Sequence, residues 1–142
     1  MNFRYRDFAG ATVMLLAAAG TAWAQTSGPA IVGAWKLTRI VGNDAVPGVL
    51  ATVEISQDGK LTGDAGCNRF VGTISIKEDS VQVSQVVSTR RLCLNPVQAQ
   101  EDALLRSLET ITRADIDDTG HLVMRNDREV VLEATALAEQ PR

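Results

Sequence analysis

The chain has 142 residues and a formal net charge of −3, with two cysteines and one histidine. Its acidic balance, with no basic cluster along the sequence, gives little electrostatic basis for binding nucleic acid or anionic lipid. One histidine and two cysteines form no recognisable zinc-binding pattern, so no metal or other cofactor is expected.

The N-terminal segment has the three parts of a secretory signal peptide. Residues 1–8 carry two arginines, residues 13–19 are apolar, and Ala22-Trp23-Ala24 is an A-x-A cleavage site. The apolar run is shorter than the roughly 20 residues that span a bilayer. We therefore expect residues 1–24 to be removed from the 142, leaving 118 residues in the periplasm with no stable membrane insertion.

The segment after the cleavage site predicts a leader followed by strands. Residues 25–30 are polar and contain glycine and proline, which favours a flexible leader. Strand-like alternation starts near Ile31, where Trp35 and Leu37 share one face. Further strands are predicted around residues 52–56 and from residue 61, on either side of an Asp-Gly turn at 58–59. Later strands are predicted at residues 70–76, from residue 81, and at residues 86–91, 114–116, 122–124 and 130–134.

One late segment has the period of a helix. Asn95 is expected to cap it, with Pro96 at the first helical position, and the helix is predicted over residues 96–110. Spacings of three, four and seven relate Val97, Glu101, Leu104, Leu105, Leu108 and Ile111, and the apolar residues among them form a stripe that faces the core. The predicted fold is α+β and mostly antiparallel β: a curved sheet or partial barrel of seven to eight short strands, with this helix packed on it.

Cys67 and Cys93 are an even pair in an exported chain, which favours a disulfide. Joining them closes a loop that stabilises the fold by roughly 3–3.5 kcal/mol in the chain-entropy model. The alternative is a pair of free or catalytic thiols, although the spacing is not C-x-x-C and no histidine is near in sequence.

Other polar groups are expected to be solvated surface residues. His121 follows Gly120 in a predicted turn, and the acidic residues 115–118 lack the spacing of a calcium loop. Arg90 and Arg91 suggest an anion site, but neighbours in a strand point to opposite faces, so at most one can face a ligand. No catalytic constellation is recognised.

The strongest local pattern lies between two predicted strands, where Gly66-Cys67-Asn68-Arg69 precedes Phe70-x-Gly72. With the Trp35 strand, the Thr89-to-Cys93 segment and the helix led by Glu101, it resembles the META domain of HslJ-like bacterial envelope proteins. The resemblance covers about residues 31–134, and we place the domain at 31–135 with a tail at 136–142. The residues that carry it are Trp35, Gly66, Cys67, Asn68, Arg69, Thr89, Cys93 and Glu101.

The resemblance implies a non-enzymatic envelope protein, associated with stress or antibiotic tolerance, that binds an unknown envelope protein or surface; we expect a monomer. An alternative follows from Gly33-x-Trp35, which also opens small β-barrels such as periplasmic inhibitors of secreted metalloproteases. Those inhibitors insert an N-terminal segment into the protease, a role that residues 25–30 could take.

Overall fold

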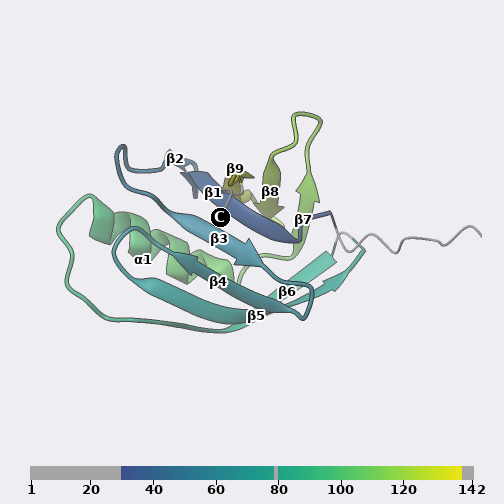
Figure 1. Ribbon diagram of the computed structural model, residues 1–142, viewed down its shortest axis with the longest axis horizontal. Helices are drawn as coiled ribbons and strands as arrows, with labels where there is room; N and C mark the ends of the chain where they lie inside the picture. The colour runs from purple at the N-terminus through teal and green to yellow at the C-terminus, as the bar shows by residue number, and fades with distance from the viewer. Residues whose placement is uncertain (1–29, 79, 139–142) are drawn as a thin grey trace, which may run out of the picture.

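The computed structural model describes residues 30–78 and 80–138. The predicted signal peptide, all of the leader except Ala30, and residues 139–142 of the tail lie outside this part. Within it the chain forms nine strands and one helix (Figure 1). Their bounds are β1 Gly33–Ile40, β2 Asn43–Asp44, β3 Thr52–Ile55, β4 Lys60–Asp64, β5 Arg69–Lys77, β6 Ser80–Ser88, α1 Val97–Leu108, β7 Arg113–Ile116, β8 Leu122–Arg125 and β9 Val130–Ala136.

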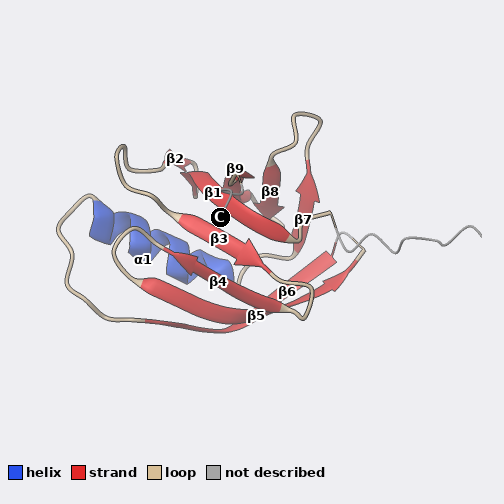
Figure 2. Cartoon of the chain, in the orientation of Figure 1, coloured by secondary structure: helices blue, strands red, loops and turns tan. Residues whose placement is uncertain are grey.

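The strands form one antiparallel sheet that closes on itself. β1 pairs with β3, and each strand from β3 to β8 pairs with the next. β9 then returns to pair with β1, where Lys36 lies opposite Thr135. Eight strands therefore make a closed barrel, and the short β2 is an extra strand beside β1 (Figure 2). The predicted antiparallel fold with one late helix is confirmed in outline, and the structure adds closure of the ring.

The barrel is weakest between β6 and β7, which pair in register only at Ser80 and Arg113. Helix α1 packs against β6 and β1 near this seam. Just beyond the helix, Glu109 Oε1 accepts the Val86 N–H of β6 at 3.1 Å. The helix end thus supplies a partner for an amide on a strand edge that has no neighbouring strand.

Trp35 and Leu37 both point into the core, as their alternation predicts. Trp35 is 7% exposed, and its indole N–H donates to the Ile31 carbonyl at 2.9 Å. From the helix, Leu104 and Leu108 enter the same core, as the apolar stripe predicts. No helix in the described part of the chain is long and apolar enough to cross a membrane.

The structure corrects the predicted strand at 86–91. Residues 80–88 are one strand with a bulge, because Gln85 and Val86 together lie opposite Gly72 of β5. Gln85 has a φ of +56°, and the bulge reverses the alternation so that Val87 points outward. Residues 89–94 lie outside the strand.

The predicted capping role of Asn95 is also wrong. The N-cap position belongs to Pro96, and no side chain caps the helix. The Leu94 carbonyl accepts the Gln98 N–H at 3.2 Å instead, so a backbone group satisfies a first-turn amide that would otherwise need a side chain.

Replacing Trp35 by alanine should lower the free energy of unfolding by about 3–5 kcal/mol, because it empties a large core volume and removes the indole bond to Ile31. Urea denaturation of the folded protein measures the loss. Val87→Ala, at a side chain that is 62% exposed, is the control and should change stability by less than about 0.5 kcal/mol. Equal effects of the two substitutions would contradict the placement of Trp35 in the core.

Candidate functional site

The family-like motif forms a tight corner between β4 and β5. Asp64 Oδ1 accepts the Gly66 N–H at 2.8 Å, and the Ala65 N–H donates to the Asn68 carbonyl at 2.8 Å. Gly66 has a φ of +110°, and a Cβ there would lie 2.7 Å from Val49 Cγ1. Only glycine fits this position, since both the backbone conformation and the lack of space exclude a side chain.

Asn68 is the centre of the hydrogen bonds around this corner. Its side chain is buried, and its Oδ1 accepts the Thr89 hydroxyl and the Arg91 N–H, each at 2.8 Å. Its Nδ2 donates to the Arg91 carbonyl at 3.0 Å and to Glu101 Oε1 at 2.7 Å. One amide side chain therefore uses both donors and both acceptor positions, and connects the corner to residues 89–91 and to the helix.

Glu101 is a charged residue on the buried face of α1, and it is 4% exposed. Its Oε2 accepts the Asn68 N–H at 3.0 Å, and its Oε1 accepts the amide of the same side chain. Both carboxylate oxygens are thus occupied by one residue of the corner. Burying a carboxylate costs free energy unless its oxygens are hydrogen-bonded. The two hydrogen bonds from Asn68 meet this requirement for Glu101.

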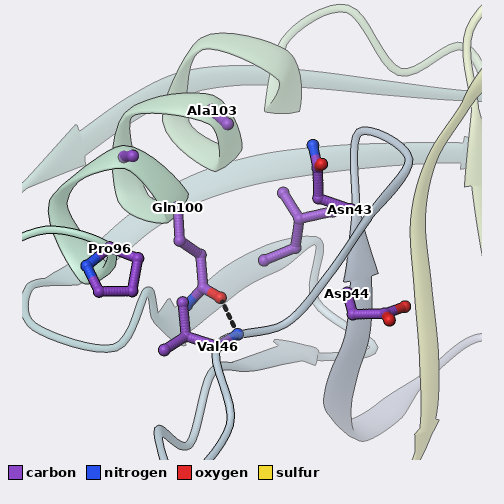
Figure 3. Close-up of a pocket in the computed structure, with 8 residues that line it drawn as sticks. Asn43, Asp44, Val46, Pro96, Gln100 and Ala103 are labelled. Atoms are coloured by element: carbon purple, nitrogen blue, oxygen red, sulfur yellow. Dashed lines mark hydrogen bonds between the residues drawn. The ribbon is translucent and has the colours of Figure 1, made fainter.

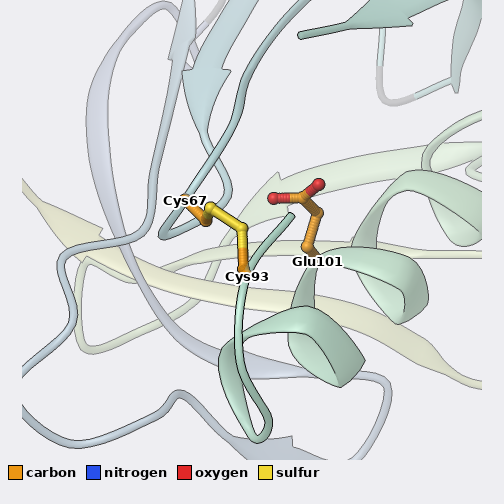
Figure 4. Close-up of side chains that lie close together, drawn as sticks. All are labelled: Cys67, Cys93 and Glu101. Carbon is orange, nitrogen blue, oxygen red and sulfur yellow. A yellow bond between two sulfur atoms is a disulfide. The ribbon is translucent and has the colours of Figure 1, made fainter. Parts of the chain in front are cut away.

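The disulfide joins Cys67 and Cys93 with their Cα atoms 6.3 Å apart, and neither cysteine is free. It lies beside Glu101 (Figure 4). The two sulfurs and the carboxylate are close enough together to suggest a metal site. However, the sulfurs are bonded to each other and the carboxylate oxygens accept from Asn68, so this cluster holds the corner in place and does not fit a cation.

Gln100 is a residue of this region that the sequence reading missed. Its Oε1 accepts the Val46 N–H at 2.7 Å, and its Nε2 donates to the Ala65 carbonyl at 3.0 Å. It ties the β1–β3 connection and the motif corner to the helix. The available signal was a polar residue one turn before Leu104, on the side of the helix that faces the core.

A pocket of about 310 Å³ opens beside Gln100, between α1 and the β1–β2 hairpin (Figure 3). It is lined by Ile40, Asn43, Asp44, Val46, Pro96, Ala99, Gln100 and Ala103. A second hollow of about 270 Å³ shares Ala103 and continues along the helix to Thr110 and Glu129. We call the two together the helix groove. Small residues of the helix, Ala99, Ala103 and Ser107, line part of this groove, so the backbone of a bound segment can approach closely there.

The remaining predicted residues are spread over the molecule. Trp35 is in the core and Arg69 is exposed at the start of β5, where its N–H donates to the Thr89 hydroxyl at 3.2 Å. His121 is exposed in a turn, with its Nδ1 4.0 Å from the Asp117 carboxylate. The Thr119 hydroxyl bond, helped by the His121 N–H, lowers the pKa of Asp117. These acids form the solvated turn that the sequence predicts.

Asn68→Ala should lower the free energy of unfolding by about 3 kcal/mol or more, because it leaves Glu101 Oε1 and the Arg91 amide without partners, while the backbone N–H of residue 68 still donates to Glu101 Oε2. Asn68→Ala/Glu101→Ala should cost at least about 1 kcal/mol less than the sum of the single changes, since the two residues act as one unit. Urea denaturation with the disulfide intact measures all three.

The matched control for this cycle is Asn43→Ala, at an exposed asparagine whose Nδ2 bonds only to the Val41 carbonyl. It should cost less than about 0.5 kcal/mol. Additive effects of Asn68→Ala and Glu101→Ala, or an Asn68 effect no larger than the control, would show that the pair is not a coupled unit.

Comparison with known proteins gives the family of the chain and agrees with its fold. A family model of the META domain matches residues 29–139. A solved structure described as "NMR structure of the protein from Burkholderia xenovorans" is 23% identical with a TM-score of 0.60, covering 75% of this chain and 83% of that one. A second, described as "NMR structure of the protein", is 15% identical with a TM-score of 0.60, covering 76% and 94%. No curated protein matches. The chain belongs to the META domain family.

Proposed function

We propose that this chain is a non-enzymatic, monomeric protein of the bacterial envelope, of the HslJ type, that is exported and binds an envelope partner in the helix groove. The groove is the observation that carries the proposal. It combines apolar walls at Ile40 and Ala103 with exposed polar groups at Asn43 and Asp44. Its first pocket reaches the lower end of the sizes that binding sites have, which suits a short peptide segment.

A binding role fits the chemistry of the titratable groups better than catalysis does. Glu101 and the two cysteines are already bonded within the fold. At the Asp117 turn the carboxylate accepts from Thr119, while His121 does not touch that hydroxyl. A nucleophile–base relay needs the base to bond the nucleophile directly, so this turn does not resemble one.

The proposed association with stress or antibiotic tolerance comes from the HslJ-like resemblance. The binding role has separate physical support in the rigidity of the groove wall. Gln100 is hydrogen-bonded to the motif corner through the Ala65 carbonyl, and the disulfide closes that corner. A wall that is already ordered loses little entropy when a partner binds.

Ala99→Arg should abolish binding of the partner, because Ala99 is an exposed wall of the groove where a long charged side chain would occupy the space. The matched control is Ala34→Arg, at an exposed residue of β1 that does not line the groove. Affinity capture from an envelope fraction, followed by mass spectrometry, compares the wild-type chain with both variants.

One component retained by wild type and by Ala34→Arg, and lost with Ala99→Arg, is the expected result of this capture. The Ala99→Arg variant should also fail to restore an envelope-stress phenotype that the control restores. A captured component that binds all three proteins equally would contradict the groove as the binding site.

Processing at Ala24 should yield a periplasmic protein of 118 residues that begins at Gln25. Intact-mass measurement of the periplasmic fraction gives the residue at which the chain starts. Changing Ala22 and Ala24 to bulky residues should block cleavage, because the peptidase accepts small side chains there. A chain that keeps residues 1–24 in wild type, and is released only by detergent, would contradict export with cleavage.

A further inference from the structure

Two leucines in the segment between β6 and α1 are almost completely exposed to solvent. Leu92 is fully exposed (100%) and Leu94 is 88% exposed, one on each side of Cys93. The segment is held firmly, because Cys93 is bonded to Cys67 and both the N–H and the carbonyl of Arg91 are bonded to Asn68. The leucines therefore cannot turn inward without breaking the motif corner.

Three arginines come together beside these leucines, which the sequence alone does not reveal. Arg90 and Arg91 directly precede Leu92 and are both exposed, since residues 89–94 are not a strand with alternating faces. Arg69 is far away in sequence, but its carbonyl accepts the Thr89 N–H at 3.0 Å, which places it next to them. None of the three forms an ion pair with an acidic side chain in residues 30–78 and 80–138.

The nearby acidic side chains of the described residues accept hydrogen bonds from neutral amide groups and form no ion pair with these arginines. Asp64 lies opposite Arg69 in the β4–β5 register, and its Oδ1 accepts the Gly66 amide. Glu101 is buried against Asn68, and Asp102 accepts from the Gln98 side chain at 2.9 Å. An apolar pair continues the patch along the outer face of the barrel, because Val71 and Val87 are register partners and are both exposed.

We propose that this patch, the leucine–arginine tip, docks the protein on the surface of an anionic lipid bilayer. Leu92 and Leu94 insert among the headgroups and upper acyl chains, while Arg69, Arg90 and Arg91 contact lipid phosphates. Proteins bind the membrane interface through apolar side chains that insert and basic side chains that attract anionic lipid. Either interaction alone is weak, and the two together hold the protein on the bilayer. The proposal goes beyond the helix groove, since neither leucine lines it.

The shape and charge of the tip favour a bilayer over a protein partner. The two exposed apolar side chains are leucines, and leucine is under-represented among the residues that carry the binding energy of protein interfaces. A bilayer surface is deformable and needs no matching pocket. The chain as a whole is acidic, so a local positive tip also sets which side of the molecule faces an anionic surface.

Vesicle sedimentation tests the proposal. The protein starting at Gln25 is used so that the apolar residues 13–19 cannot contribute, and it retains every strand and the helix. It should bind vesicles of phosphatidylcholine containing about 30% phosphatidylglycerol, bind phosphatidylcholine alone far less, and be released by high salt. Leu92→Ser/Leu94→Ser should weaken binding at least about tenfold, and Arg90→Gln/Arg91→Gln by about fivefold for each charge.

Two controls keep the test specific. Arg113→Gln/Arg128→Gln removes the same charge from exposed positions elsewhere, and should leave vesicle binding close to wild type. Ala99→Arg adds a positive charge and should not weaken vesicle binding, so failure of the groove and failure of the tip are separable. No binding to anionic vesicles, equal binding to neutral vesicles, or equal loss with the control arginines would overturn the proposal. Retention of an envelope protein through Leu92 and Leu94 without vesicle binding would overturn it in favour of a protein partner.

Discussion

The buried pairing of Glu101 with Asn68 is the contact on which the arrangement of this region depends. A carboxylate at 4% exposure must have its oxygens hydrogen-bonded, and both are bonded to Asn68. The same Asn68 side chain fixes the backbone of Arg91, so the helix, the motif corner and the segment after β6 take one relative position. The helix groove and the leucine–arginine tip both depend on that position.

The disulfide and the helix stabilise this small barrel in two different ways. The disulfide restricts the unfolded chain over the segment that contains β5 and β6, which is worth roughly 3 kcal/mol in the chain-entropy model. The helix packs near the seam where β6 and β7 pair at one register position, and Glu109 supplies a partner to the open edge. Closure through β1 and β9 leaves few unpaired edges, which limits edge-to-edge aggregation.

The sequence predicts the strands, the helix and the cysteine pair because each has a local signal: alternation, a 3.6-residue period, or an even cysteine count. It fails where a single residue changes the register. The bulge at Gln85 moves Val87 to the outer face, so the valines of residues 81–87 looked like two strands. Ring closure is also a property of pairing between distant strands, β1 and β9, which no local pattern encodes.

The site was less accessible to sequence reasoning than the fold. The motif could be named, but the role of Asn68 required knowing that residues 68, 91 and 101 meet in space. Along the sequence no basic cluster predicts binding to anionic lipid. Folding brings Arg69 beside Arg90 and Arg91 and so creates a local cluster that linear order conceals.

Native-state hydrogen exchange tests most directly whether the Asn68–Glu101 contact holds this region together. The amides of Asn68 and Arg91 donate to Glu101 and to the Asn68 side chain, so they should exchange only through opening of the whole domain, as slowly as the core strand amide of Val53. Arg90 and Leu92 flank Arg91 in the same exposed segment and should exchange quickly. If the Asn68 and Arg91 amides exchange as fast as those two neighbours, the region opens locally and the contact does not have the role assigned to it.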